Sequence, residues 1–203
     1  DEKSDIRAYF LAAEPSVDYS WPRLRGSFLY ASGDKDPFDE KSKGFSSIFE
    51  NPQFAGADTS FWIRQNIPLI GGGGVTLSQR NGVLPDLRSS KEHGQSNFVN
   101  PGLRLLGGGA DFDVLPQLRL STNINHLNFN QTDVLEVLRN EGEIRSSIGW
   151  DMSASAIYRP VMSQNVVFRL SYAALLPGKG FKDLYHTENE HFYTLLANLT
   201  LAY

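Results

Sequence analysis

Arginine side chains recur along segments of the chain in which polar and apolar residues alternate. Guanidinium groups keep their charge at neutral pH and pair bidentately with carboxylates, so a wall that carried them would attract an anionic solute. The sequence predicts that the following arginines line such a wall on the polar phase of the alternation: Arg7, Arg25, Arg119, Arg145, Arg159 and Arg169.

Aspartates on the same phase leave a second interpretation open. Asp111, Asp113 and Asp151 also fall on the polar phase and are predicted to line the same wall. Arginines and aspartates that face one another would pair and stabilise the wall without selecting any solute. The sequence is consistent with both selective lining and structural pairing.

A cation site is a further candidate in the acidic run that begins at Asp34. Asp34, Asp36 and Asp39 place carboxylates close together, and calcium takes oxygen ligands of this kind. An Asp- and Pro-rich turn explains the same residues and is the favoured interpretation. No other cofactor is expected.

Catalytic residues do not form any motif in this chain. The four histidines, His93, His126, His186 and His191, lack a recognisable arrangement with a nucleophile and an acid, and cysteine is absent. We therefore do not expect an enzyme.

Composition and length limit the class of protein. The 203 residues carry 19 Lys and Arg against 23 Asp and Glu, and no basic run suits a nucleic acid partner. No stretch approaches the roughly 18 consecutive apolar residues that a membrane helix needs. A single domain over residues 1–203 is expected.

Alternation with period two is the strongest structural signal. At the C-terminal end Tyr193, Leu195, Leu199, Leu201 and Tyr203 share one face, with tyrosines near both ends as in the aromatic girdles of membrane barrels. Similar segments lie near 6–12, 23–30, 101–114, 118–130, 148–158 and 166–176. The pattern of about seven such strands predicts an all-β, antiparallel transmembrane β-barrel, although a soluble β-sandwich or lipocalin-like barrel also alternates.

Two leucines interrupt this pattern. Leu103 and Leu105 are out of phase with Leu106 and the apolar residues after it, and a β-bulge near Leu105 would restore the alternation. The phase of Arg104 therefore stays open. Ile148 is placed with Trp150 on the apolar face.

The connections differ in length on the two sides. Short turns at 14–21, 115–117 and 160–165 alternate with long polar segments at 34–99, 131–142 and 177–190. Bacterial outer-membrane barrels combine short periplasmic turns with long extracellular loops, which makes 34–99 a long extracellular loop. The strand number is odd whereas such barrels are even, so we expect the chain to be the C-terminal portion of a larger barrel.

Four motifs resemble the alginate-export family of outer-membrane barrels. They are GSFLYASGDKDP at 26–37, NPQFAG at 51–56, SNFVNPGL at 96–103 and LLPGKGFKDL at 175–184. The resemblance spans most of the chain and implies the C-terminal half of a large monomeric barrel that conducts an anionic polysaccharide.

These expectations define a location and a set of partners. The chain is expected in the outer membrane of a Gram-negative bacterium, in contact with outer-membrane lipid and with an anionic solute or polysaccharide that it transports as a porin. A general porin and a structural barrel that holds a periplasmic or electron-transfer protein partner are alternatives. An outer-membrane enzyme is the least favoured one.

Overall fold

The computed structural model describes residues 5–36, 39, 41–45, 54–56, 60–61, 101–140, 142–160 and 165–202. The long strands are β4 (Pro22–Ala31), β6 (Leu103–Leu115), β7 (Leu118–Phe129), β8 (Ser147–Tyr158), β9 (Val166–Pro177) and β10 (Phe192–Leu201). The short strands are β1 (Asp5–Ile6), β2 (Phe10–Ala13), β3 (Ser16–Asp18) and β5 (Lys41–Ser42), and the helices are α3 (Asp133–Arg139) and α4 (Lys179–Tyr185). None of the described helices has the length and apolar character needed to cross a membrane.

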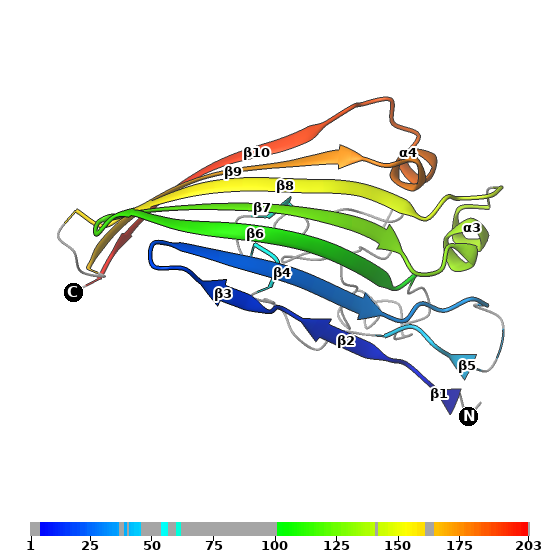
Figure 1. The fold of residues 1–203 in the computed structure, drawn as a ribbon. Coiled ribbons are helices and arrows are strands. Elements are labelled where there is room, and N and C mark those ends of the chain that lie inside the picture. Colours follow the sequence, from blue (N-terminus) through cyan, green and yellow to red (C-terminus); the bar gives the residue numbers. More distant parts are fainter. Residues whose placement is uncertain are drawn as a thin grey trace.

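One large antiparallel sheet dominates the fold, with the strand order β10-β9-β8-β7-β6-β4-β2 and β3 beside β4 (Figure 1). β2 and β3 form one interrupted strand, because the pairs Ala13–Phe28 and Ser16–Arg25 keep the same register. The interruption lies at Pro15, which has no N–H to donate, although its carbonyl accepts a hydrogen bond from Gly26 N at 2.9 Å. The prediction of an all-β antiparallel fold is confirmed.

The two edges of this sheet are β10 and the interrupted strand formed by β2 and β3, and the sheet does not close within the described residues. Every neighbouring pair is antiparallel, so β2 and β10 run in the same direction. A small separate sheet pairs β1 with β5 in parallel.

The two ends of the large sheet differ, and α3 and α4 both lie at one of them, the helix end (Figure 1). α3 lies between β7 and β8, and α4 lies between β9 and β10, within the segments expected to be long loops. Each helix is followed by a residue in the left-handed conformation, Asn140 (φ 51°) or His186 (φ 47°), which ends the helical turn. The opposite end, the turn end, carries the tight β6–β7 connection at Pro116 and Gln117.

The two faces of the sheet have different chemistry. We call outer face the one that exposes Leu24, Leu106, Ile124 and Leu170, and inner face the one that carries Arg25. The alternation predicted along each long strand produces this division, because successive side chains of a strand point to opposite faces.

At the helix end the inner face is apolar and forms the hydrophobic core. Leu105, Leu127 and Phe129 are at most 1% exposed there, and they belong to one cluster with Leu135 of α3 and Leu184 of α4. Burial of this face against the two short helices gives the sheet its densest packing in the described part of the chain.

The expected bulge near Leu105 is wrong. β6 keeps an unbroken register with β7 from Leu103 to Asp113, and the register shift falls between Asp113 and Leu115. Leu103 and Leu105 look out of phase because the inner face changes from polar to apolar toward the helix end. Arg104 consequently lies on the outer face.

Ile148 was assigned to the wrong face. It is fully buried in the core, whereas Trp150 is 45% exposed. A register shift opposite Leu127 and Asn128, together with the positive φ of Gly149 (137°), turns Ile148 inward.

Candidate functional site

The inner face changes in three steps along the strands, from the apolar core at the helix end to charged residues at the turn end. Between them lies a polar middle zone, in which Asn123 is the register partner of Ser153 and Asn125 is the partner of Asp151. These four side chains are buried. Burial of polar side chains is tolerated only where hydrogen bonds replace water, so their partners define the site.

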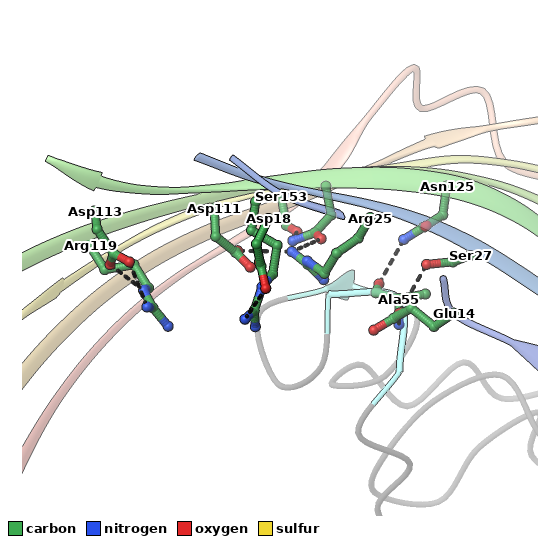
Figure 2. A network of polar contacts seen from close by, with 12 residues as sticks. Glu14, Asp18, Arg25, Ser27, Ala55, Asp111, Asp113, Arg119, Asn125 and Ser153 are labelled. Carbon is green, nitrogen blue, oxygen red and sulfur yellow. Dashed lines mark hydrogen bonds and ion pairs between the residues drawn. The ribbon is translucent and has the colours of Figure 1, made fainter. Parts of the chain in front are cut away.

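Toward the turn end, arginines and aspartates face one another in pairs (Figure 2). Arg119 donates from Nε and Nη2 to the two oxygens of Asp113 at 2.6 and 2.8 Å, and Arg25 Nη2 lies 3.0 Å from Asp111 Oδ1. Arg25 also donates to Asn123 Oδ1 at 2.8 Å. The structure thus brings these four predicted wall residues together as ion pairs.

Arg159 and Arg169 extend the charged zone across β8 and β9. Arg169 lies opposite Ile157, on the phase of the inner face, and Arg159 follows the end of β8 on the same phase. Arg159 donates its backbone N–H to Gln117 O at 2.8 Å. Its Nε is buried and has no hydrogen-bond partner within the described residues.

A hollow of about 260 Å³ opens at the turn end of the inner face. Its lining combines charges of both signs, from Asp18, Arg23, Asp111, Asp113 and Arg119, with Ser20, Trp21 and Pro22. Arg23 and Asp18 are direct cross-strand partners, and Arg23 Nη2 donates to Asp18 Oδ2 at 3.2 Å. The hollow therefore offers donors and acceptors to a polar solute.

Residues from the long segment 34–99 cover the middle zone. Ala55 N donates to Glu14 Oε2 at 2.7 Å, and Asn125 Nδ2 donates to Ala55 O at 2.9 Å (Figure 2). Phe61 N donates to Asp151 Oδ1 at 3.0 Å. These bonds hold Ala55 and Phe61 on the inner face. The remaining part of the predicted loop, at 37–38, 40, 46–53, 57–59 and 62–99, lies outside the described residues.

Glycines provide the space for this contact. A Cβ atom at Gly107 would lie 1.9 Å from Asn125 Oδ1, and one at Gly109 would lie 2.4 Å from Asn123 Oδ1. Gly56 has a φ of +100°, and a Cβ there would lie 2.9 Å from Asn123 Cγ. Glu14, Asn123 and Asn125 were not predicted from the sequence. The Asn-x-Asn spacing opposite a glycine run was the signal that could have revealed the two asparagines.

Two predicted wall residues lie elsewhere. Arg7 is in the link between β1 and β2, where its Nε donates to Asp5 Oδ2 at 2.9 Å. Arg145 precedes β8, and its Nε donates to Asp183 Oδ2 of α4 at 2.8 Å. Neither residue belongs to a strand of the large sheet, so the structure does not bring them to the other arginines.

The acidic run has the contacts of a turn. Asp34 Oδ1 accepts a hydrogen bond from Asp36 N at 3.4 Å, and Asp39 Oδ1 accepts one from Lys41 N at 3.0 Å. Asp34 is buried, and this burial raises the pKa of its carboxyl group. No group of three or more acidic or histidine side chains positioned for a metal occurs among the described residues. The calcium site stays a prediction, and the contacts observed favour the turn.

We expect the attachment of α4 to weaken in acid. The hydrogen bonds from Arg145 lower the pKa of Asp183, so the folded state holds its proton less tightly than the unfolded chain does. The stabilisation is therefore present above the unfolded-state pKa, near 3.8, and is lost as the pH falls through the lowered folded-state value. The protection factors of the amides in 179–185, each taken relative to the intrinsic exchange rate at the same pH, should be high at pH 7 and lower at pH 3, and Asp183→Asn should already lower them at pH 7. Equal protection of the variant and the parent at pH 7 would contradict this role.

No family model, curated protein or solved structure matches the chain, so its resemblance to the alginate-export family stands as a prediction.

Proposed function

We propose that this chain forms part of the wall of an outer-membrane β-barrel pore that conducts an anionic solute. The observation that carries the proposal is the contrast between the two faces of one sheet. The outer face exposes large apolar side chains along every long strand, while the inner face carries arginine, aspartate, asparagine and serine. A barrel wall between lipid and an aqueous lumen requires this division.

Aromatic residues at both ends of the outer face support a membrane location. Trp21 and Phe112 contact each other near the turn end, with ring centroids 5.6 Å apart, and Trp150 stands near the helix end of β8. Trp150 and Tyr158 on the same strand are separated by roughly 26 Å at the usual rise per residue. That separation suits an apolar band about 25 Å tall, bounded by aromatic girdles.

Among the described residues, the turn end of the inner face carries more arginines than carboxylates. Arg23, Arg25, Arg119, Arg159 and Arg169 lie there with Asp18, Asp111 and Asp113, whereas the carboxylates of Glu14 and Asp151 lie in the middle zone. A lumen with this balance lowers the barrier for an anion. The resemblance to alginate exporters adds an acidic polysaccharide as the preferred cargo.

Single-channel recording of the full-length gene product in planar bilayers tests the proposal. We expect an anion-selective current that oligouronates block. Replacing both Arg159 and Arg169 by glutamate should reduce the anion-to-cation permeability ratio about fivefold or more, since a reversed charge a few ångströms from the ion path is worth at least ~1 kcal/mol.

The matched control is Arg7→Glu, which reverses an exposed charge outside the large sheet and should leave the reversal potential unchanged. A double variant with the reversal potential of the parent would show that Arg159 and Arg169 do not face the permeating ion.

A structural barrel without conductance is a second candidate. It is favoured by the apolar core that fills the inner face at the helix end and by Ala55 and Phe61, which are hydrogen-bonded on the middle zone. Absence of any conductance, together with stable co-purification of a periplasmic protein, would support this second function and exclude the first.

A further inference from the structure

Arg104 is the only charged side chain on the outer face among the described strand residues of the large sheet. It is exposed and lies on the phase of Leu106, one position from the helix end of β6. No carboxylate pairs with it in the described part of the chain. An exposed guanidinium at the boundary of an otherwise apolar surface can take an anionic partner from outside the described residues.

The neighbours of Arg104 are polar and aromatic. Tyr30 and Asn128 are its register partners on the two adjacent strands, and His126 and Trp150 pair one step further from the helix end. We call these five residues the rim cluster.

Two contacts hold the rim cluster in place. Arg104 Nη2 donates to Phe129 O at 3.2 Å, which fixes the guanidinium beside the sheet and leaves its outer edge exposed. The rings of His126 and Trp150 pack against each other at an interplanar angle of 40°, with their centroids 4.6 Å apart.

The histidine adds a second donor. Asn128 Nδ2 lies 3.1 Å from His126 Nδ1, an arrangement in which the amide donates to the tautomer that is protonated on Nε2. The rim cluster thus combines a guanidinium with an imidazole on adjacent strands of the outer face, and both groups bind phosphate oxygens.

We infer that the rim cluster binds the phosphate of an anionic lipid headgroup. The inference rests on the proposed membrane location. A lipid is favoured over a free phosphate ion because the surface next to the cluster is apolar: Leu106 is 67% exposed and Ile124 is 44% exposed on the strands that carry Arg104 and His126. Acyl chains can lie along these side chains while the headgroup stays at the level of Arg104, Tyr30 and Trp150.

Native mass spectrometry of the full-length protein, released from neutral detergent, tests the inference. The probes are phosphatidylglycerol, phosphatidylcholine with its offsetting choline charge, and inorganic phosphate. We expect the parent protein to retain phosphatidylglycerol in preference to phosphatidylcholine, and R104Q to bind phosphatidylglycerol about fivefold more weakly, the effect of one basic residue at a membrane surface. R7Q removes an exposed arginine outside the large sheet and should bind as the parent does.

Two results would overturn the inference. One is equal retention of phosphatidylglycerol by the parent and R104Q, and the other is displacement of the lipid by inorganic phosphate at millimolar concentration. Flotation with phosphatidylglycerol-containing vesicles separates this from the proposed function. Failure of the parent to float would contradict the proposed membrane location itself. Normal flotation of both proteins with equal lipid retention would contradict only the headgroup site.

Discussion

Replacing Phe129 with alanine is expected to lower the free energy of unfolding by about 3–5 kcal/mol. Phe129 is fully buried at the helix end of β7, within the cluster that joins the sheet to α3 and α4. Truncation removes apolar contacts and leaves a cavity that a rigid sheet cannot close. Guanidinium unfolding of the full-length protein in detergent micelles, followed by circular dichroism, measures the difference.

Phe168→Ala is the matched control for this change. Phe168 belongs to the same sheet but is 46% exposed on the outer face, so its truncation opens no cavity inside the protein. We expect Phe168→Ala to lower the free energy of unfolding by less than half as much as Phe129→Ala does. Similar losses at the two positions would mean that the core at the helix end does not carry the stability of the fold.

Replacing Gly149 with alanine should lower the free energy of unfolding by a comparable amount, about 3 kcal/mol, through backbone strain and overpacking. Gly149 has a φ of 137°, which residues with a Cβ rarely adopt, and a Cβ there would lie 2.1 Å from Leu176 O. The same backbone stretch receives the hydrogen bond from Gly178 N to Ile148 O at 2.7 Å. The variant should therefore unfold at lower denaturant concentration and expose α4 to protease earlier than the parent.

Gly142→Ala controls for the loss of glycine itself. A Cβ at Gly142 would have no heavy atom within 4 Å, and the residue is exposed. Its replacement should change the unfolding midpoint little. If Gly149→Ala were as well tolerated as Gly142→Ala, the bulge that turns Ile148 into the core would have to adopt another backbone conformation.

The strands were predictable because each has two faces in different surroundings. Alternation located all six long strands, β4 and β6 to β10, since a side-chain period of two survives whatever covers each face. The N-terminal strand predicted near 6–12 is present only in part, as β2. The turn predicted at 14–21 is wrong over Ser16–Asp18, because the chain resumes pairing with β4 after Pro15 and forms β3. Short connections were visible from proline and polar residues, as at Pro116.

The errors arose where a face changes character along one strand. The phase of Leu103 and Leu105 was assigned on the assumption that the inner face is polar along the whole strand. In the structure this face becomes apolar under α3 and α4. α3 and α4 themselves were not predicted, because segments of about two helical turns carry too little periodicity to be distinguished from polar loops.

The polar network depends on contacts between distant parts of the chain. Glu14, Ala55 and Asn125 come together across more than a hundred residues of sequence, so no local pattern contains their hydrogen bonds. Arg145 was predicted to line the wall because it is an arginine in an alternating segment. It lies just before β8, where it pairs with Asp183 instead. Residue type predicted the chemistry, and only the fold decided the partner.

Along the strands, the polarity of the inner face decreases from the turn end to the helix end through the three zones. At the turn end an anion would find full charges such as Arg119, then amide and hydroxyl dipoles at Asn123 and Ser153 beside the carboxylate of Asp151, and finally hydrocarbon at Leu127 and Phe129. Because each step offers weaker compensation for lost water, the free energy of a bare anion would rise toward the helix end. Movement of an anion along this face would therefore be energetically directional even with the sheet held rigid.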